Sequence, residues 1–221
     1  QSASPAILTA NGGFGKSRTA IEFAHANSSL YETVLFLNST SIEQFRESLV
    51  RVASPMGLSV VSRSQADIYQ EVLASLPAYC HNGLLIIVDG IDEPGTAKYV
   101  KGQLQALGSA HIVITSRLKH WGQSFKQIEI GALSIHEATR MLSLSDGSEA
   151  KTQHAHLESV ATLLGGMPLA LETAVAYVRL RGMNYDEYER LLTETPKQLL
   201  NWQDSLAADY PTTVWNAFRL T

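Results

Sequence analysis

Short apolar runs alternate with amphipathic stretches in the first part of the chain. The runs at residues 7–10, 34–38, 84–89, 111–115 and 128–130 have the length and composition of buried strands. Between them, apolar residues recur at helical spacing: Ile42, Phe45, Leu49 and Val52 form one face, and Ile68, Val72 and Leu76 form another. Strands that alternate with helices are joined by crossovers, so the pattern predicts an α/β fold with a parallel sheet.

The pattern changes at Ser134, after which no strand-like run follows. Helices are predicted at residues 135–144, 154–164, 169–180 and 185–193, separated by breaks that contain glycine. We therefore expect a sheet domain over residues 1–132 and a small all-helical domain over residues 133–205. Right-handed crossovers in the first domain would bring the carboxyl ends of its strands to one edge, where ligands bind in such folds.

A glycine-rich segment between the first apolar run and a helical stretch carries the strongest chemical signal. It reads Asn11-Gly12-Gly13-Phe14-Gly15-Lys16-Ser17. A strand, a glycine-rich turn, a Lys-Ser pair and a helix form the layout of a phosphate-binding loop. Glycines allow successive N–H groups to point inward at an anion, and the following helix adds its positive end.

Within this loop, Lys16 would reach the β- and γ-phosphates of a nucleotide, and the Ser17 hydroxyl would bind Mg²⁺. Ala10 stands where the usual pattern has its first glycine. The alternative interpretation is a glycine-rich turn between a strand and a helix, with a surface lysine.

A carboxylate is predicted at the ligand edge of the sheet. Residues 84–88 are so apolar that this strand must be buried on both faces, and Asp89 follows directly. Asp89 would assist Ser17 in holding Mg²⁺, bound through water. One of Asp92 and Glu93 would orient or deprotonate an attacking water. The alternative is a solvated acidic turn after a core strand.

An arginine follows the next predicted strand, in the segment Thr115-Ser116-Arg117. We expect this strand beside the phosphate-loop strand, so that Arg117 approaches the γ-phosphate and distinguishes ATP from ADP by charge-assisted hydrogen bonds. A surface arginine at a strand end is the alternative. The segment Gly166-Met167-Pro168-Leu169-Ala170 reads, from physical chemistry alone, as a connection between two helices.

Composition narrows the possible partners. The chain has 221 residues and a formal net charge of −4, with no basic run, which argues against direct nucleic-acid binding. The longest apolar run is too short to cross a bilayer, and no signal-peptide pattern is present. The one cysteine, Cys80, is expected to be an inert thiol in a reducing compartment, which predicts a cytoplasmic location. We expect the sequence to be a piece of a longer protein.

Together, these motifs resemble the signal-transducing NTPases with numerous domains (STAND), and within them the NB-ARC group of NOD-like receptors. The phosphate loop, the strand that ends at Asp89, the Thr-Ser-Arg segment and the Gly-Met-Pro-Leu-Ala segment match the motifs of that group in order and spacing. The group includes plant resistance proteins, the apoptotic protease-activating factor, and fungal and bacterial relatives.

The resemblance implies roles that the residues alone do not. Pro168 and Leu169 would lie against the adenine, Arg18 and Thr19 would begin the helix near the α-phosphate, and Arg117 would sense the γ-phosphate. The fold would be a P-loop NTPase three-layer sandwich followed by an ARC1-like helical domain. Residues 206–221 would begin a winged-helix domain. The ending Asp-Gly-Ile-Asp-Glu resembles the sister NACHT group, which leaves the subfamily open.

Three functions are compatible with these features. The first is a switch that binds ATP or ADP with Mg²⁺, hydrolyses ATP slowly and self-associates through the full-length protein. The resemblance implies immune, cell-death or incompatibility signalling, with effector and repeat domains elsewhere in the protein. The second is a hydrolase or phosphotransferase with steady turnover, which Asp92 and Glu93 would permit. For hydrolysis at either rate, the candidate catalytic residues are Lys16, Asp92, Glu93 and Arg117. The third is a STAND-type transcription regulator with a separate DNA-binding domain.

Overall fold

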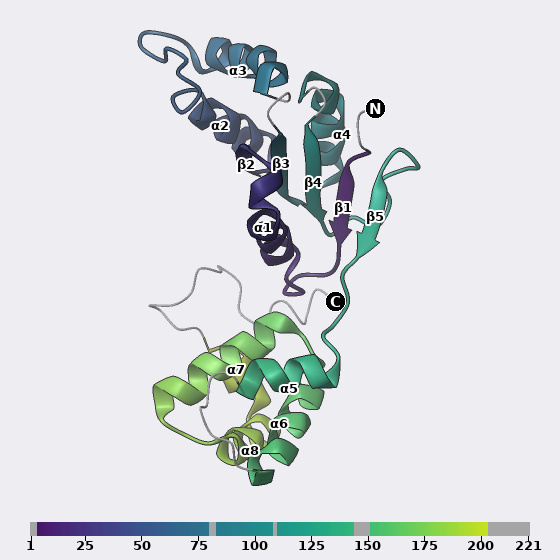
Figure 1. The fold of residues 1–221 in the computed structure, drawn as a ribbon. Helices are drawn as coiled ribbons and strands as arrows, with labels where there is room; N and C mark the ends of the chain where they lie inside the picture. Colours follow the sequence, from purple (N-terminus) through teal and green to yellow (C-terminus); the bar gives the residue numbers. More distant parts are fainter. Residues whose placement is uncertain (1–3, 80–82, 108–109, 144–150, 203–221) are drawn as a thin grey trace. The chain divides into compact units, whose positions relative to one another are not determined.

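The structure is a computed structural model that describes residues 4–79, 83–107, 110–143 and 151–202. Its centre is a sheet of five parallel strands in the order β2-β3-β4-β1-β5 (Figure 1). The strands are β1 (Ala6–Thr9), β2 (Thr33–Asn38), β3 (Leu84–Ile91), β4 (His111–Ser116) and β5 (Lys126–Glu129). The predicted parallel α/β sheet is therefore confirmed. Cys80 and the predicted winged-helix segment at residues 206–221 lie outside the described residues.

Strand β4 lies between β1 and β3. Its place beside β1, the strand before the predicted phosphate loop, agrees with the prediction from the sequence. In the register of these pairs, Thr9 faces Ser116. On the other side of β3, Asn38 of β2 faces Asp89. Because the strands are parallel, the last residues of all five meet at one edge.

Helices cover both faces of the sheet, so the sheet unit has three layers. On one face, α1 (Lys16–Ala26) packs Ala20 and Ala24 against Leu85 and Ile87 of β3. The opposite face carries α2 (Ile42–Val52), α3 (Gln65–Tyr79) and α4 (Pro94–Gln103), whose apolar side chains share a core with Ile86. Alternate residues of β3 thus enter two different cores, which explains why the whole strand is apolar.

The sequence did not predict α4, or the short 3₁₀ helices η1 (Ser28–Leu30) and η3 (Leu104–Leu107). Strand β3 also continues two residues beyond its expected end at Asp89. The register between β3 and β4 shifts between Val88 and Ile91, and Gly90 in this interval has φ = +85°. A shift of this kind bends the strand end and redirects the side chains that follow.

A second group of helices follows the sheet. It contains α5 (Ile135–Ser143), α6 (Lys151–Leu163), α7 (Pro168–Arg181), α8 (Tyr185–Glu194) and the short α9 (Pro196–Leu200). Their core is one apolar cluster that includes Leu142, Leu171 and the fully buried ring of Tyr185. The Tyr185 hydroxyl donates to the Leu142 carbonyl (3.1 Å), so that burying the ring leaves no polar atom unpaired.

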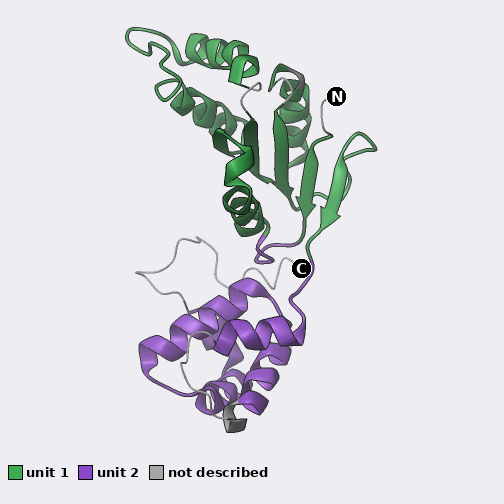
Figure 2. Cartoon of the chain, viewed as in Figure 1, with its two compact units in different colours: residues 1–10, 16–130 green, residues 11–15, 131–221 purple. Residues whose placement is uncertain are grey.

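Contacts divide the chain into two compact units (Figure 2). The sheet unit contains residues 1–10 and 16–130, and the helical unit contains residues 11–15 and 131–221. The segment Asn11–Gly15, which forms most of the predicted phosphate loop, therefore groups with the helices.

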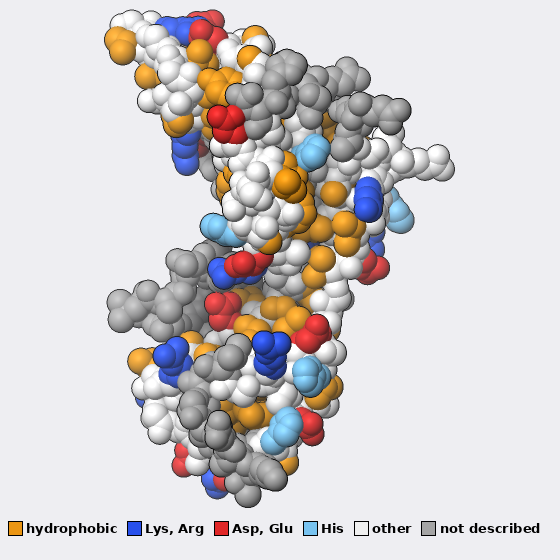
Figure 3. All heavy atoms as spheres, in the orientation of Figure 1, with side chains coloured by type: hydrophobic (Ala, Val, Ile, Leu, Met, Phe, Trp, Pro, Cys, Tyr) orange, Lys and Arg blue, Asp and Glu red, His pale blue; other side chains and the backbone are white. Residues whose placement is uncertain are grey.

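Two surface properties bear on the expected partners. On the face of the molecule shown in Figure 3, basic side chains are interspersed with acidic ones. In the described part of the chain, no helix combines the length and the apolar character that crossing a membrane requires.

A pair of adjacent glycines connects α6 to α7, and only one of them is tightly enclosed. Gly165 and Gly166 both have φ = +62°, a conformation that favours glycine. A Cβ atom on Gly166 would lie 2.3 Å from the carbonyl oxygen of Leu133, whereas a Cβ on Gly165 would meet nothing within 4 Å. The backbone carbonyl of Gly166 also accepts the N–H of Leu133 (2.9 Å).

We predict that Gly166→Ala destabilises the protein more than Gly165→Ala does. Both substitutions should cost about 1 kcal/mol because alanine disfavours this backbone conformation. Gly166→Ala should cost roughly a further 1–3 kcal/mol, since a backbone carbonyl must move away from the new methyl group. Denaturant unfolding of the two variants measures the difference, and equal midpoints would contradict the close approach of residues 133 and 166.

Candidate functional site

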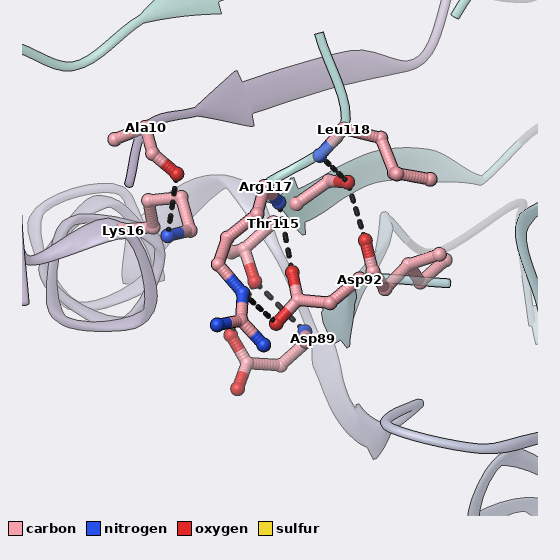
Figure 4. Close-up of polar contacts among 10 residues, drawn as sticks. Ala10, Lys16, Asp89, Asp92, Thr115, Arg117 and Leu118 are labelled. Carbon is pink, nitrogen blue, oxygen red and sulfur yellow. Dashed lines mark hydrogen bonds and ion pairs between the residues drawn. The ribbon is translucent and has the colours of Figure 1, made fainter. Parts of the chain in front are cut away.

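A buried threonine links the ends of β3 and β4 at the carboxyl edge of the sheet (Figure 4). The side chain of Thr115 is fully buried. Its hydroxyl donates to Asp89 Oδ1 (2.6 Å) and accepts the backbone N–H of Gly90 (2.9 Å). One hydroxyl therefore fixes both the Asp89 carboxylate and the backbone turn that follows it.

Asp92 and Arg117, which the sequence assigned to separate tasks, form one pair. Arg117 Nε donates to Asp92 Oδ2 (2.6 Å), and the backbone N–H of Arg117 donates to Asp92 Oδ1 (2.8 Å). Both carboxylate oxygens of Asp92 are thus engaged with the residue that was predicted to sense the γ-phosphate. The contacts set the direction of the arginine side chain (Figure 4).

Glu93 lies in a different environment from Asp92. It is exposed and stands at the N-terminal cap position of α4, just before Pro94. Its side chain makes no capping hydrogen bond to that helix. Of the two carboxylates predicted to act on water, Glu93 is therefore the one that is not held by Arg117.

Ser116 shapes the turn that presents Arg117. Its buried hydroxyl donates to the carbonyl of Ile91 and accepts the backbone N–H of Leu118 (3.0 Å). Sequence reasoning placed Thr115 and Ser116 in a motif but gave neither a role in the site. The signal that could have found them is the presence of two hydroxyl residues at the end of a strand that is otherwise apolar and buried.

Lys16 is the first residue of α1, and its ammonium group donates to the carbonyl of Ala10 (2.9 Å). Burial lowers the pKa of Lys16, and the positive charge of Arg117 adds to this effect. The carboxylates of Asp92 and Asp89 act in the opposite direction and raise this pKa. The sheet unit thus brings together four charged groups of the predicted site: Lys16, Asp89, Asp92 and Arg117.

Two glycines of the glycine-rich segment have positive φ values. Gly13 and Gly15 have φ values of +80° and +79°. Residues that carry a Cβ atom disfavour this conformation. Within the helical unit, the Gly13 carbonyl accepts the N–H of Leu169 (3.1 Å), and Phe14 packs against the helical core. Pro168 is also near, since its Cγ lies 3.9 Å from where a Cβ on Gly15 would be.

The remaining predicted residues lie on the loop and the start of α1. Asn11, Gly12 and Ser17 are half-buried, whereas Arg18 and Thr19 are exposed. Arg18 pairs with Glu22 on its own helix (2.7 Å). Arg18 therefore pairs within the first turns of α1.

The chemistry of the predicted magnesium ligands fits Mg²⁺ bound together with phosphate. One carboxylate oxygen of Asp89 accepts the hydrogen bond from Thr115. The other oxygen of an ionised carboxylate can still act as an acceptor. Among the described residues, no group of three or more His, Cys, Asp or Glu side chains is arranged to hold a metal ion. Mg²⁺ typically takes one or two protein oxygens and completes its shell with water and substrate phosphate.

Comparisons with known proteins give similarity only at the level of structure. No protein-family model matches the chain, and no curated protein matches it. Among solved structures, it is similar to a STAND protein with a tetratricopeptide repeat sensor from Pyrococcus horikoshii, with a TM-score of 0.53 and 17% identity over 78% of this chain and 27% of that one. AMPPCP-bound DnaA from Aquifex aeolicus matches with a TM-score of 0.55 and 13% identity over 96% of this chain and 66% of that one.

A third similar structure is Cdc6p from Pyrobaculum aerophilum, with a TM-score of 0.53 and 12% identity over 81% of this chain and 56% of that one. The chain has the P-loop NTPase fold. The predicted fold class, a three-layer P-loop NTPase sandwich followed by helices, is thereby confirmed. The chain spans about a quarter to two-thirds of the length of these structures.

We predict that Thr115→Val destabilises this P-loop NTPase fold, whereas Thr115→Ser does so less. Valine has nearly the shape of threonine but leaves the Gly90 N–H without its acceptor and Asp89 without its donor, which costs about 1–3 kcal/mol. Serine keeps both hydrogen bonds and loses one buried methyl group, worth roughly 0.8 kcal/mol. Urea unfolding monitored by circular dichroism distinguishes the two, and a serine variant no more stable than the valine variant would contradict this role.

Lys16→Met should raise the stability of the nucleotide-free protein. Burial lowers the pKa of Lys16, so the folded state disfavours the charged form of this side chain. The resulting loss of stability is fully present at a pH below the pKa of the folded state, and it disappears at a pH above the pKa of the unfolded state. Methionine fills similar space without a charge. The matched control is Lys98→Met on the exposed surface of α4. A melting temperature at pH 7 that falls for Lys16→Met but not for Lys98→Met would refute the prediction.

Proposed function

We propose that the chain is a nucleotide switch module that binds ATP or ADP with Mg²⁺ and hydrolyses ATP slowly. The observation that carries the proposal is the meeting of Lys16, Asp89, Asp92 and Arg117 at the carboxyl edge of a parallel sheet. A cation that follows a glycine loop, a carboxylate fit for Mg²⁺ and an arginine on the adjacent strand are what binding a polyphosphate requires.

Lys16 would be the main phosphate ligand among the side chains. Its ammonium is partly removed from water and bonded to a neutral carbonyl, Ala10 O. Phosphate oxygens carry negative charge and would replace that carbonyl with a stronger, charge-assisted partner. Gly13 and Gly15 supply the backbone freedom that a phosphate loop needs, and Asn11, Gly12, Phe14, Arg18 and Thr19 would complete its surroundings.

Ser17 and Asp89 would hold the metal, which supplies charge neutralisation at the phosphates. Asp92 would position Arg117, because both of its oxygens bind that residue. Glu93 would then be the carboxylate that orients water. Pro168 and Leu169 would contact the adenine.

The pairing of Asp92 with Arg117 favours a switch over a steadily turning-over enzyme. A γ-phosphate would compete with Asp92 for the guanidinium, so the arrangement of the two residues would depend on whether ATP or ADP is bound. Arg117 would pair with Asp92 in one state and with the γ-phosphate in the other. A nucleotide sensor requires two such arrangements.

For the biological setting, we propose a STAND protein of the NB-ARC or NACHT group, in which residues 1–132 bind nucleotide and residues 133–205 form an ARC1-like domain. The motif order and the structural similarity to an archaeal STAND protein support this assignment. The full-length protein would then act in the cytoplasm in immune, cell-death or incompatibility signalling. It would self-associate and carry effector and repeat domains.

Isothermal titration with ATP and ADP in the presence of Mg²⁺ tests the proposal. We expect Lys16→Met to abolish the binding of both nucleotides. Arg117→Ala should lower the affinity for ATP about tenfold, as for the loss of one charge-assisted hydrogen bond, and should change the affinity for ADP less than about twofold. Arg18→Ala, which removes an exposed arginine paired with Glu22, is the matched control. The turnover of ATP should be well below the ~10 s⁻¹ typical of enzymes.

Two results would count against the proposal in different ways. A wild-type protein that binds neither nucleotide, or that binds both after Lys16→Met, would refute the phosphate loop. Equal losses of ATP and ADP affinity in Arg117→Ala would refute only the sensor role.

A further inference from the structure

The segment Asn11–Gly15 is held by the first turn of α7. Leu169 is the second residue of that helix, and its N–H donates to the Gly13 carbonyl (3.1 Å). The first N–H groups of a helix have no partner within the helix, and Pro168 has none to offer. Leu169 thus uses the first available donor of α7 to bind the glycine segment.

This hydrogen bond also determines the direction of a second backbone group. A trans peptide is planar, so its C=O and N–H point in opposite directions, and the described residues contain no cis peptide bond. Because the Gly13 carbonyl points at α7, the N–H of Phe14 in the same peptide points away from α7. Amides with a fixed direction are what a loop needs to bind an anion.

Contacts with side chains also restrain the two residues that form this peptide. The Phe14 ring packs against the core of the helical unit. A Cβ atom on Gly13 would lie 2.2 Å from the end of the Met167 side chain and 3.3 Å from Leu169 Cβ, and the φ of +80° at Gly13 also favours glycine. The orientation of the peptide between residues 13 and 14 is therefore fixed by contacts with residues 167–169.

We propose that the Leu169 N–H is a positioning group for phosphate binding, with Phe14 as its apolar anchor. The helical unit sets the direction of a loop amide through this bond, independently of any contact with a base. The inference rests on the proposed nucleotide binding by the same loop. It predicts that phosphate affinity depends on a backbone N–H that itself need not contact the phosphate.

The test compares Leu169→Pro with Leu169→Ala in the full chain. Proline fits the first turn of a helix but has no N–H, whereas alanine keeps the N–H and removes the leucine side chain. The probe is inorganic pyrophosphate with Mg²⁺, which has no base to contact Pro168 or Leu169. We expect Leu169→Pro to bind pyrophosphate about fivefold more weakly than Leu169→Ala does, which is the effect of one hydrogen bond.

A second pair of variants keeps the test valid if Leu169→Pro does not fold, as judged by circular dichroism. Phe14→Ala removes the anchor and should lower the affinity for pyrophosphate several-fold. Phe14→Leu keeps an apolar anchor and should retain most of the wild-type affinity. If Leu169→Pro folds and binds pyrophosphate like the wild type, or if Phe14→Ala does so, the inference is wrong while the phosphate loop stands. If the wild type fails to bind pyrophosphate and ADP alike, the proposed function fails first.

Discussion

The site depends on one buried hydroxyl group at the meeting point of two strands. Thr115 binds both the carboxylate of Asp89 and the amide of Gly90, so the end of β4 determines how the end of β3 turns. The register shift after Val88 and the positive φ of Gly90 follow at that point. Asp92 comes two residues after Gly90 and accepts the backbone N–H of Arg117, which directly follows the strand that carries Thr115. Hydrogen bonds from Thr115 on β4 and from Arg117, which directly follows β4, therefore arrange both carboxylates.

The charges at this edge do not serve stability alone. The ammonium of Lys16 is partly withdrawn from water, and Arg117 adds a second positive charge in the same region. Asp89 and Asp92 compensate in part. Natural proteins accept such costs mainly where a ligand makes use of them, because an apolar edge would be more stable. A partly buried lysine beside three other charged groups is the kind of cluster that favours a functional site.

The sequence was sufficient for the features that depend on local composition. The apolar runs identified every strand in the described residues, and the β4–β1 neighbourhood followed from the motif order. Helix α4 was missed because its buried face is formed by Thr96, Ala97 and Val100, which give a weak helical pattern. The pairing of Asp92 with Arg117 depends on the register and on the bend of β3, and neither property is encoded in the spacing of the residues. Gly13 and Leu169 are far apart in the sequence, so the spacing of the residues did not predict their contact either.

The contact between Gly13 and Leu169 affects the order in which the parts of the protein fold. The loop between Gly13 and Leu169 contains the entire sheet from β2 onward, and closing so long a loop is entropically costly and slow. During synthesis the amino-terminal part emerges first and can build its strands while α7 is still untranslated. A nascent chain would thus possess a folded sheet before the peptide at residues 13 and 14 acquires its final orientation. The proposed binding of a phosphate by this loop would then become possible only at a late stage of translation.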